Sequence, residues 1–573
     1  MRITYNDKLN KLLNPYLESL LKEKSSLEPE TLTLFDLFME DLDMGGRYGI
    51  FSEILEPRLE EIIREENIES IANLMDGRLN TLFRYMLGDE FAGLFHTYLQ
   101  LEARCPHTIG YDRRAQRSAN PSNHLDHARD AWLQFLKLRA TGFSVEAILK
   151  GGNTPEDTEE FSGYMNSSYW LAAQIAQGNE KVIEYLNQVL TSENNVHRLQ
   201  RWYLHAIAIS GYRPLLELEG KLLLAAKLQE GLRQAIVETM DEGCPESYLY
   251  LFSIIYNNGL QRFASVKRSI AVCTGIGEQD SSERITNKYV ELIWNFLNHP
   301  ETARNALQSK DTVVLYLALW SIGFYDTDEI RAIVPDIIRK GAKHQIQTLL
   351  YFLRCTQSSQ MNHLISKDAF EVWHDDPKVV AAILPLYMDG LYLSRYSDNK
   401  EAPTLSDYFE SPEEAVRHYG YLKQVYQSIS AKEIYSPYVF PWDCVVLTRS
   451  DVVHKMAYIA WMTNDIRLRE ELCTYLPALE SYSRASYIGI VLAHTESKVE
   501  QEYVLQSLGD RSSDIRDEAY KVLSEMSLSP EQYQNIEELL RFKYSEMRIN
   551  AINLLMKQPE AQLAASIRRL LSD

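Results

Sequence analysis

The chain has 573 residues, more than the ~250–300 at which single hydrophobic cores stop growing, so one compact core is excluded. A hydrophobic content of 45% and a charged content of 24% are ordinary for a folded protein and exclude disorder over most of the length. The net charge of −21 opposes binding to nucleic-acid phosphates over most of the surface, and 25 glycines and 19 prolines are few for a turn-rich β protein.

The N-terminal sequence MRITYNDKLNKLL lacks the uninterrupted apolar core of a signal peptide. The longest uncharged run, Ser247–Gln261, is shorter than the roughly 20 apolar residues of a membrane-spanning helix. The six cysteines are widely scattered, which is typical of reduced thiols and not of a disulfide framework. These features predict a cytoplasmic protein with no membrane partner.

The N-terminal part of the chain contains the densest set of potential metal ligands. Histidine and cysteine suit zinc, which takes four tetrahedral ligands. The one-residue spacing within Cys105-Pro106-His107 is unusual for zinc, however, and a polar loop followed by a helix from His124 explains the same residues. We favour the loop and predict no metal or other cofactor. The candidate ligands are His96, Cys105, His107, His124 and His127.

The same stretch holds a cluster of three arginines, Arg113, Arg114 and Arg117. Guanidinium groups pair bidentately with phosphates and carboxylates, so this cluster is a candidate binding site for an anion or an acidic peptide. The alternative is a solvated loop whose arginines pair with the many acidic residues around it.

Further along, residues 215–277 include LLELEGKLLLAAKLQEGLRQAIVETMDEG and SVKRSIAVCTGIG. This stretch resembles the helical N-terminal region of large bacterial MolR-like proteins, a group of largely unknown function. The resemblance implies a helical region followed by further domains, and it carries no catalytic residues.

A repeated apolar pattern follows between residues 305 and 390. Four apolar positions recur with a constant shift along the chain, and 330–338 supplies a second helix after a turn at Gly323 and Asp326. One helix pair for each shift fits short antiparallel helices that must stack to bury their apolar faces. The positions are Val313, Tyr316, Leu317 and Trp320, followed by Ile346, Leu349, Leu350 and Leu353.

Helix-start signals recur at Asp376-Pro377, Ser411-Pro412 and Ser529-Pro530, where a capping side chain precedes a proline at the first helical position. Between 391 and 450 we expect a long irregular insertion with one short strand, because two prolines interrupt the apolar alternation. Aromatic residues on such a loop either anchor a partner or fold back onto the helices. These candidate binding residues are Tyr435, Tyr438, Phe440 and Trp442.

Near the C-terminus, the frame Asp514-Ile515-Arg516 with Ala519 and Leu523 returns further along as Glu546-Met547-Arg548 with Ala551 and Leu555, again at a constant shift. The pattern D-[VI]-R-x2-A-x3-L resembles HEAT repeats. We therefore predict an all-α fold, an α-solenoid of HEAT-like helix pairs (an α-α superhelix). A series of amphipathic helices without a true repeat remains the alternative.

We expect an N-terminal helical domain (1–190), central HEAT-like repeats (191–390), the insertion (391–450) and C-terminal HEAT-like repeats (451–573). No nucleotide-binding or hydrolase motif occurs in the sequence. We predict a non-catalytic, acidic scaffold that binds a protein, with a basic partner favoured by the charge. The alternatives are a helical arm of a larger enzyme or regulatory protein, and a nucleic-acid-binding helical repeat.

Overall fold

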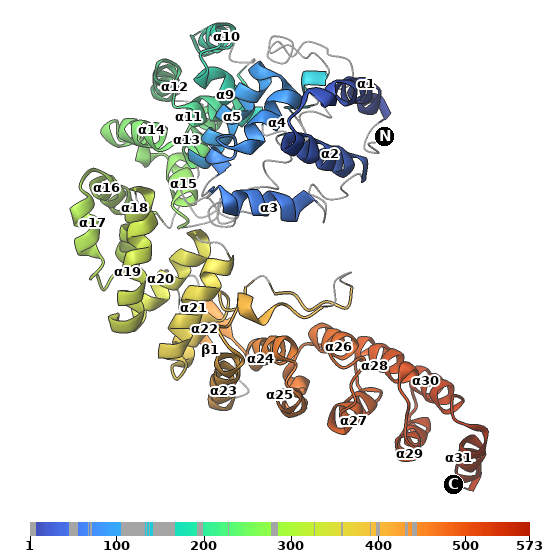
Figure 1. Cartoon of the computed structure of the whole chain (residues 1–573). Helices are drawn as coiled ribbons and strands as arrows, with labels where there is room; N and C mark the ends of the chain where they lie inside the picture. Colours follow the sequence, from blue (N-terminus) through green and yellow to red (C-terminus); the bar gives the residue numbers. More distant parts are fainter. Residues whose placement is uncertain are drawn as a thin grey trace. The chain divides into compact units, whose positions relative to one another are not determined.

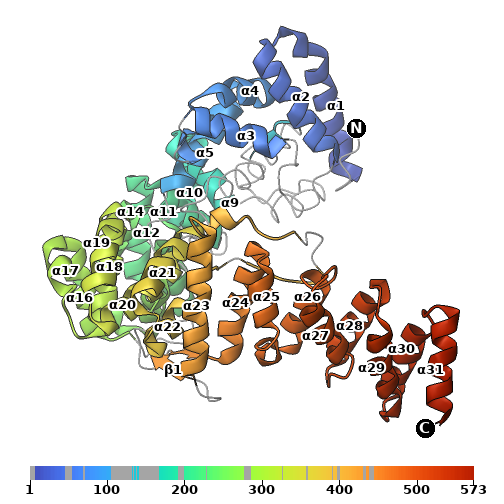
Figure 2. The ribbon, with the colours of Figure 1, turned by 60° about the horizontal axis from the view of Figure 1, so that its bottom comes forward.

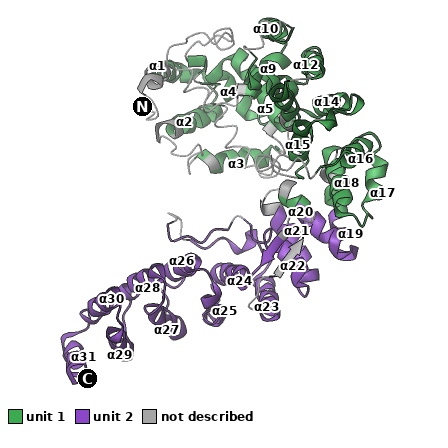
Figure 3. Ribbon diagram, turned by 180° about the vertical axis from the view of Figure 1, so that it is seen from behind, with its two compact units in different colours: residues 1–333, 352–358 green, residues 334–351, 359–573 purple. Residues whose placement is uncertain are grey.

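The computed structural model describes residues 7–44, 55–66, 68, 71–104, 132, 135–136, 138–140, 167–191, 199–226, 229–276, 285–325, 327–356, 359–389, 391–396, 401–429, 434–437 and 444–572 (Figure 1). The chain forms two compact units, residues 1–333 with 352–358 and residues 334–351 with 359–573 (Figure 3). Nearly all regular structure in the described ranges is α-helical, which confirms the all-α class.

The first unit is built from helices that pack in two alternating series. Helices α9, α11, α13 and α15 contact one another in turn, and so do α10, α12, α14, α16 and α18. The unit contains α1 (Asp7–Glu23), α2 (Pro29–Met44), α3 (Leu55–Glu65), α4 (Arg78–Leu87), α5 (Asp89–Arg104), α9 (Ser167–Ala176), α10 (Glu180–Thr191), α11 (Arg201–Ser210), α12 (Arg213–Ala225), α13 (Glu230–Glu242), α14 (Pro245–Asn257), α15 (Ala264–Cys273), α16 (Asn287–Asn298), α17 (Pro300–Ala306), α18 (Thr312–Tyr325) and the start of α19 (Thr327–Lys340).

The apolar positions predicted between 305 and 390 are confirmed as core positions, since all eight side chains are buried. They lie on α18 and on α20 (Lys343–Thr356), with α19 as the intervening helix. The turn after α18 comes later than predicted, because Gly323 lies inside the helix. Burial of such large apolar side chains is the main driving force for this packing.

The second unit begins within α19 and continues with helices and one small sheet. Its elements are α21 (Ser359–Trp373), α22 (Pro377–Ile383), α23 (Pro412–Ser428), β1 (Ile434–Pro437), β2 (Cys444–Leu447), α24 (Arg449–Thr463), α25 (Ile466–Leu472), α26 (Ser481–Ile490), α27 (Lys498–Ser507), α28 (Ser513–Glu525), α29 (Pro530–Glu538), α30 (Ser545–Leu555) and α31 (Glu560–Ser572).

The capping signals in this unit act as predicted. The side chains of Asp376, Ser411 and Ser529 accept hydrogen bonds from the first backbone N–H groups of α22, α23 and α29. At Ser529 the bond is reciprocal, because Gln532 accepts in return from the Ser529 backbone N–H. Each cap satisfies donors that the helix itself leaves unpaired.

The prediction for residues 391–450 was wrong in two respects. The stretch contains the long helix α23, so it is not irregular throughout. It also forms two strands, because β1 and β2 pair antiparallel, with Ile434 opposite Leu447 and Pro437 opposite Cys444. Pro437 lies at the last position of β1, where its missing N–H interrupts no further pairing.

The helices from α24 to α30 follow a constant spacing. Helices α24, α26, α28 and α30 begin at positions 449, 481, 513 and 545, and α25, α27 and α29 begin at 466, 498 and 530, with the same interval in both series. Helix α26 packs on α28 and α28 on α30, while α25 packs on α27, α27 on α29 and α29 on α31 (Figure 2). Residues 449–572 are called the C-terminal stack below.

The predicted core positions of the two frames are buried, namely Ile515, Ala519 and Leu523 in α28 and their counterparts Met547, Ala551 and Leu555 in α30. Among the described residues, no helix combines the length and apolar character needed to cross a membrane.

Candidate functional site

Most of the site residues predicted from sequence lie outside the described residues. These are Arg113, Arg114, Arg117, Cys105, His107, His124, His127, Tyr438, Phe440 and Trp442. The backbone of Tyr435 pairs with Val446 in the hairpin. His96 lies on α5, where its Nε2 is 3.1 Å from the Gln100 side-chain nitrogen and 3.6 Å from Asp76 Oδ1. The described residues test neither the candidate metal ligands nor the candidate anion site, and the expectation of no metal stays a prediction.

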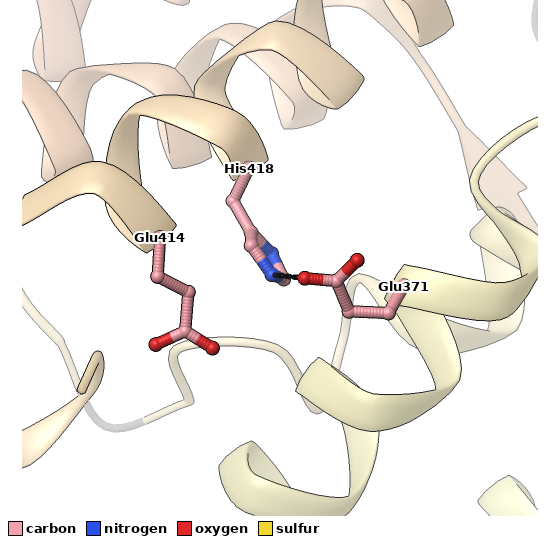
Figure 4. Close-up of side chains that lie close together, drawn as sticks. All are labelled: Glu371, Glu414 and His418. Carbon is pink, nitrogen blue, oxygen red and sulfur yellow. Dashed lines mark hydrogen bonds and ion pairs between the residues drawn. The ribbon is translucent and has the colours of Figure 1, made fainter. Parts of the chain in front are cut away.

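The structure instead reveals a polar cluster between α21 and α23 that the sequence reasoning missed. Glu414 and His418 are one helical turn apart on α23, so they share one face of that helix. Glu371 reaches them from α21, and the ligand atoms of the three side chains lie within 4.8 Å of one another (Figure 4). The spacing Glu414-x3-His418 was the one signal in the sequence.

Glu371 is the acceptor at the centre of this cluster. It accepts hydrogen bonds from Arg417 Nη2 at 2.7 Å, His418 Nε2 at 3.0 Å and the Tyr421 hydroxyl at 3.1 Å. Partial burial acts to raise the pKa of Glu371, but the bond from Arg417 and the other donors outweigh it, so the pKa is lowered. Glu371 is therefore a stable carboxylate at neutral pH.

His418 connects this carboxylate to a buried tyrosine. Its side chain is fully buried, which lowers its pKa, and its Nδ1 lies 2.8 Å from the Tyr387 hydroxyl. Since Nε2–H donates to Glu371, the neutral imidazole accepts at Nδ1 from Tyr387. The result is a hydrogen-bonded chain in which Tyr387 donates to His418 and His418 donates to Glu371.

Two carboxylates and a histidine offer the ligand types that a divalent metal such as zinc takes. Here, however, each carboxylate already has its own cation. Lys367 Nζ lies 3.1 Å from Glu414 Oε1, and Arg417 binds Glu371. A divalent ion would have to displace both cations, so the charge balance favours an ion-paired structural core.

A second buried histidine, His363, forms hydrogen bonds that hold the turn at Met388. His363 Nδ1 accepts the Met388 N–H at 2.9 Å, and its Nε2 donates to the Tyr408 carbonyl at 2.9 Å. Met388 has a φ of 51°, in the left-handed region that a non-glycine residue seldom occupies. Burial lowers the pKa of His363 to about 4, so the ring is neutral and keeps both bonds at pH 7.

Beyond Met388, residues 391–396 run over the C-terminal stack and display a tyrosine patch, defined as Tyr392, Tyr396 and Tyr482. Tyr392 is 68% exposed and Tyr396 is 73% exposed. The Tyr482 hydroxyl lies 2.7 Å from Ser394 Oγ and 3.2 Å from the Tyr392 hydroxyl, and its ring is 6.2 Å from that of Tyr396. Three aromatic side chains thus lie together on the surface.

The segment beneath these rings is firmly attached. Tyr458 of α24 donates to the Leu391 carbonyl at 2.7 Å, and the Arg395 N–H donates to Ser486 Oγ of α26 at 3.3 Å. The Arg395 side chain is largely buried and binds Asp514 Oδ1 of α28 at 2.5 Å. Contacts to α24, α26 and α28 therefore fix the segment on the stack.

Residues 34–573 match a family of unknown function, DUF5724. The chain belongs to the DUF5724 family. No curated protein and no solved structure matches this DUF5724 chain.

Proposed function

We propose that this DUF5724 protein is a non-catalytic scaffold, an acidic α-solenoid of HEAT-like helix pairs that binds another protein through the tyrosine patch. The constant spacing of helix starts supports the repeat interpretation, since stacked pairs of constant length are what a solenoid requires. The resemblance to MolR-like proteins and the cytoplasmic location stay predictions.

The observation that carries the proposal is the exposure of Tyr392 and Tyr396 on a segment that is otherwise fixed. Tyrosine is enriched at the energetic centres of protein interfaces because it buries a large ring and still offers a hydroxyl. Rings presented on an ordered backbone lose little conformational freedom on binding, which favours affinity. The net charge of −21 favours a basic partner, whose approach it accelerates.

Affinity purification of the tagged full chain from its native host, followed by mass spectrometry, tests this proposal. We expect one protein partner in stoichiometric amount at moderate salt. The double variant Tyr392→Ala/Tyr396→Ala should weaken binding of that partner at least about tenfold. Tyr325→Ala, which removes a half-exposed tyrosine from α18, should leave binding unchanged.

Recovery of the chain alone would contradict the scaffold proposal. Co-purification of nucleic acid whose binding weakens steeply with salt would instead support the nucleic-acid alternative. Equal losses in the double variant and in Tyr325→Ala would show that the tyrosine patch is not the binding site.

A further inference from the structure

The C-terminal stack contains an ion pair that follows the helix spacing. Arg516 Nη2 of α28 binds Glu546 Oε2 at 2.7 Å, in the first turn of α30. Near the C-terminal ends of the same two helices, Lys557 Nζ donates to the Ser524 carbonyl at 2.7 Å. Arg516 and Ser524 therefore both lie on the side of α28 that carries the next helix pair, with Tyr520 between them at helical spacing.

One helix pair further along the chain, the residues that correspond to Arg516, Tyr520 and Ser524 are Arg548, Ile552 and Met556. These three residues are called the outer face of α30. This face begins with an arginine, as the corresponding face of α28 does, but no described helix covers it. Arg548 is exposed and has no ion-pair partner among the described residues. Ile552 is 49% exposed and Met556 is 63% exposed, whereas their counterparts Tyr520 and Ser524 are half-buried.

This face is more apolar than the internal face it corresponds to. Isoleucine and methionine replace tyrosine and serine, and Ile549 beside them is 55% exposed where α28 has Asp517. The last helix of a stack that faces only water needs a polar outer surface. Exposed contiguous apolar side chains next to an unpaired cation instead mark an interaction surface.

We infer that the outer face of α30 binds a helix pair of a partner protein whose first helix carries an acidic residue in its first turn, stacked as α30 is stacked on α28. The acid would pair with Arg548 as Glu546 pairs with Arg516, and an apolar helix face would cover Ile552 and Met556.

A second copy of this chain is a poorer occupant. The α30 helix of each copy already packs on its own α28, and its Met547, Ala551 and Leu555 side chains are buried. A partner protein therefore fits this face better than a second copy does. This surface is separate from the tyrosine patch, so either proposal can fail without the other.

Residues 541–573 of the chain itself, made as a labelled peptide, provide a probe of the required chemistry. This segment carries the acid Glu546 and the helix α30 that packs on α28. We expect the peptide to bind the full chain with a rise in fluorescence anisotropy. Arg548→Glu should weaken binding about tenfold, because it replaces an attractive pair with a repulsive one.

The decisive comparison is the charge swap. A peptide with Glu546→Arg should bind the wild-type chain weakly. It should bind the Arg548→Glu chain about as tightly as the wild-type peptide binds the wild-type chain. Arg568→Glu is the matched control, since it makes the same charge change at an exposed arginine of α31 and should leave binding unchanged.

An isolated peptide can fail to fold, so the full chain extended by a second copy of 541–573 supplies an independent measurement. We expect slower hydrogen exchange in α30 of the extended chain, and loss of that protection with Arg548→Glu. Absence of both peptide binding and added protection would overturn the inference. So would equal effects of Arg548→Glu and Arg568→Glu, or self-association of the chain that Ile552→Glu abolishes.

Discussion

The C-terminal stack and the region of α21 to α23 belong to the same unit but are stabilised differently. In the stack, neighbouring helices meet mainly through buried apolar side chains, and ion pairs such as the buried Arg469–Glu500 and the more exposed Arg516–Glu546 join helices about one repeat apart. Between α21 and α23, the interior itself is polar and contains His418 and Tyr387. A regular stack can therefore rely on local patterning, whereas the irregular region needs specific long-range partners to satisfy its buried polar groups.

The largest difference should appear when a buried partner is removed. His418→Ala leaves the Tyr387 hydroxyl buried without its acceptor and creates a cavity, so we expect a loss of about 3 kcal/mol in local stability. Hydrogen exchange of amides in α21 and α23 measures this loss. His494→Ala, at an exposed histidine after α26, is the control and should change stability by less than about 0.5 kcal/mol.

Equal effects of the two histidine substitutions would show that the polar cluster contributes no more to stability than an ordinary surface position. The two regions would then not differ in how they are stabilised.

Acidification should next separate the α21–α23 region from helices α28 and α30 of the stack. The pKa of His363 is lowered by burial to about 4, below the ordinary value near 6.5, so the unfolded chain binds a proton more readily than the folded one. The stability contributed by the neutral ring is complete above pH 6.5 and is lost as the pH falls toward 4. At pH 5 the loss is about 2 kcal/mol.

Hydrogen exchange at pH 7 and pH 5, corrected for intrinsic rates, tests this. Amides of α21 and the Met388 turn should lose protection, and those of α28 and α30 should change little. A uniform change over both regions, or none in α21, would contradict the assignment of His363 as a buried neutral ring.

The smallest expected effect concerns the stack. Ser529→Ala removes the capping box of α29 and should cost about 1 kcal/mol, measured by urea unfolding or by exchange in α29. Ser527→Ala, close by and exposed, should cost almost nothing. If the two serines behave alike, the cap does not contribute to the order of the stack.

The stack was largely predictable from sequence, because its information is local. Ser529 with Pro530 indicates the start of α29, and the frame around Arg516 returns at Arg548 within one helix pair. Helical periodicity likewise identified the buried faces of α18 and α20. Each of these signals depends on residues within about one repeat of each other, which is the range over which pattern analysis is informative.

The polar cluster was not predictable in the same way. Glu371 lies 47 residues from His418, and Tyr387 lies 31 residues from it, with helix α22 and a left-handed residue between α21 and α23. No periodicity relates these positions, so only the folded chain brings them together. The hairpin was missed although its signals are local. Pro437 was interpreted as an interruption of the pattern, whereas it is the last residue of β1.

The attachment of Arg395 to Asp514 has a consequence for the order of folding. The two residues are 119 positions apart, whereas helices within the stack meet across loops of a few residues. Closing the longer loop costs more chain entropy and gains only the ion pairs of Arg395 with Asp514 and Glu518 and a few hydrogen bonds. The stack should therefore assemble first from neighbouring pairs, with the 391–396 segment and its tyrosines docking in a later, slower step.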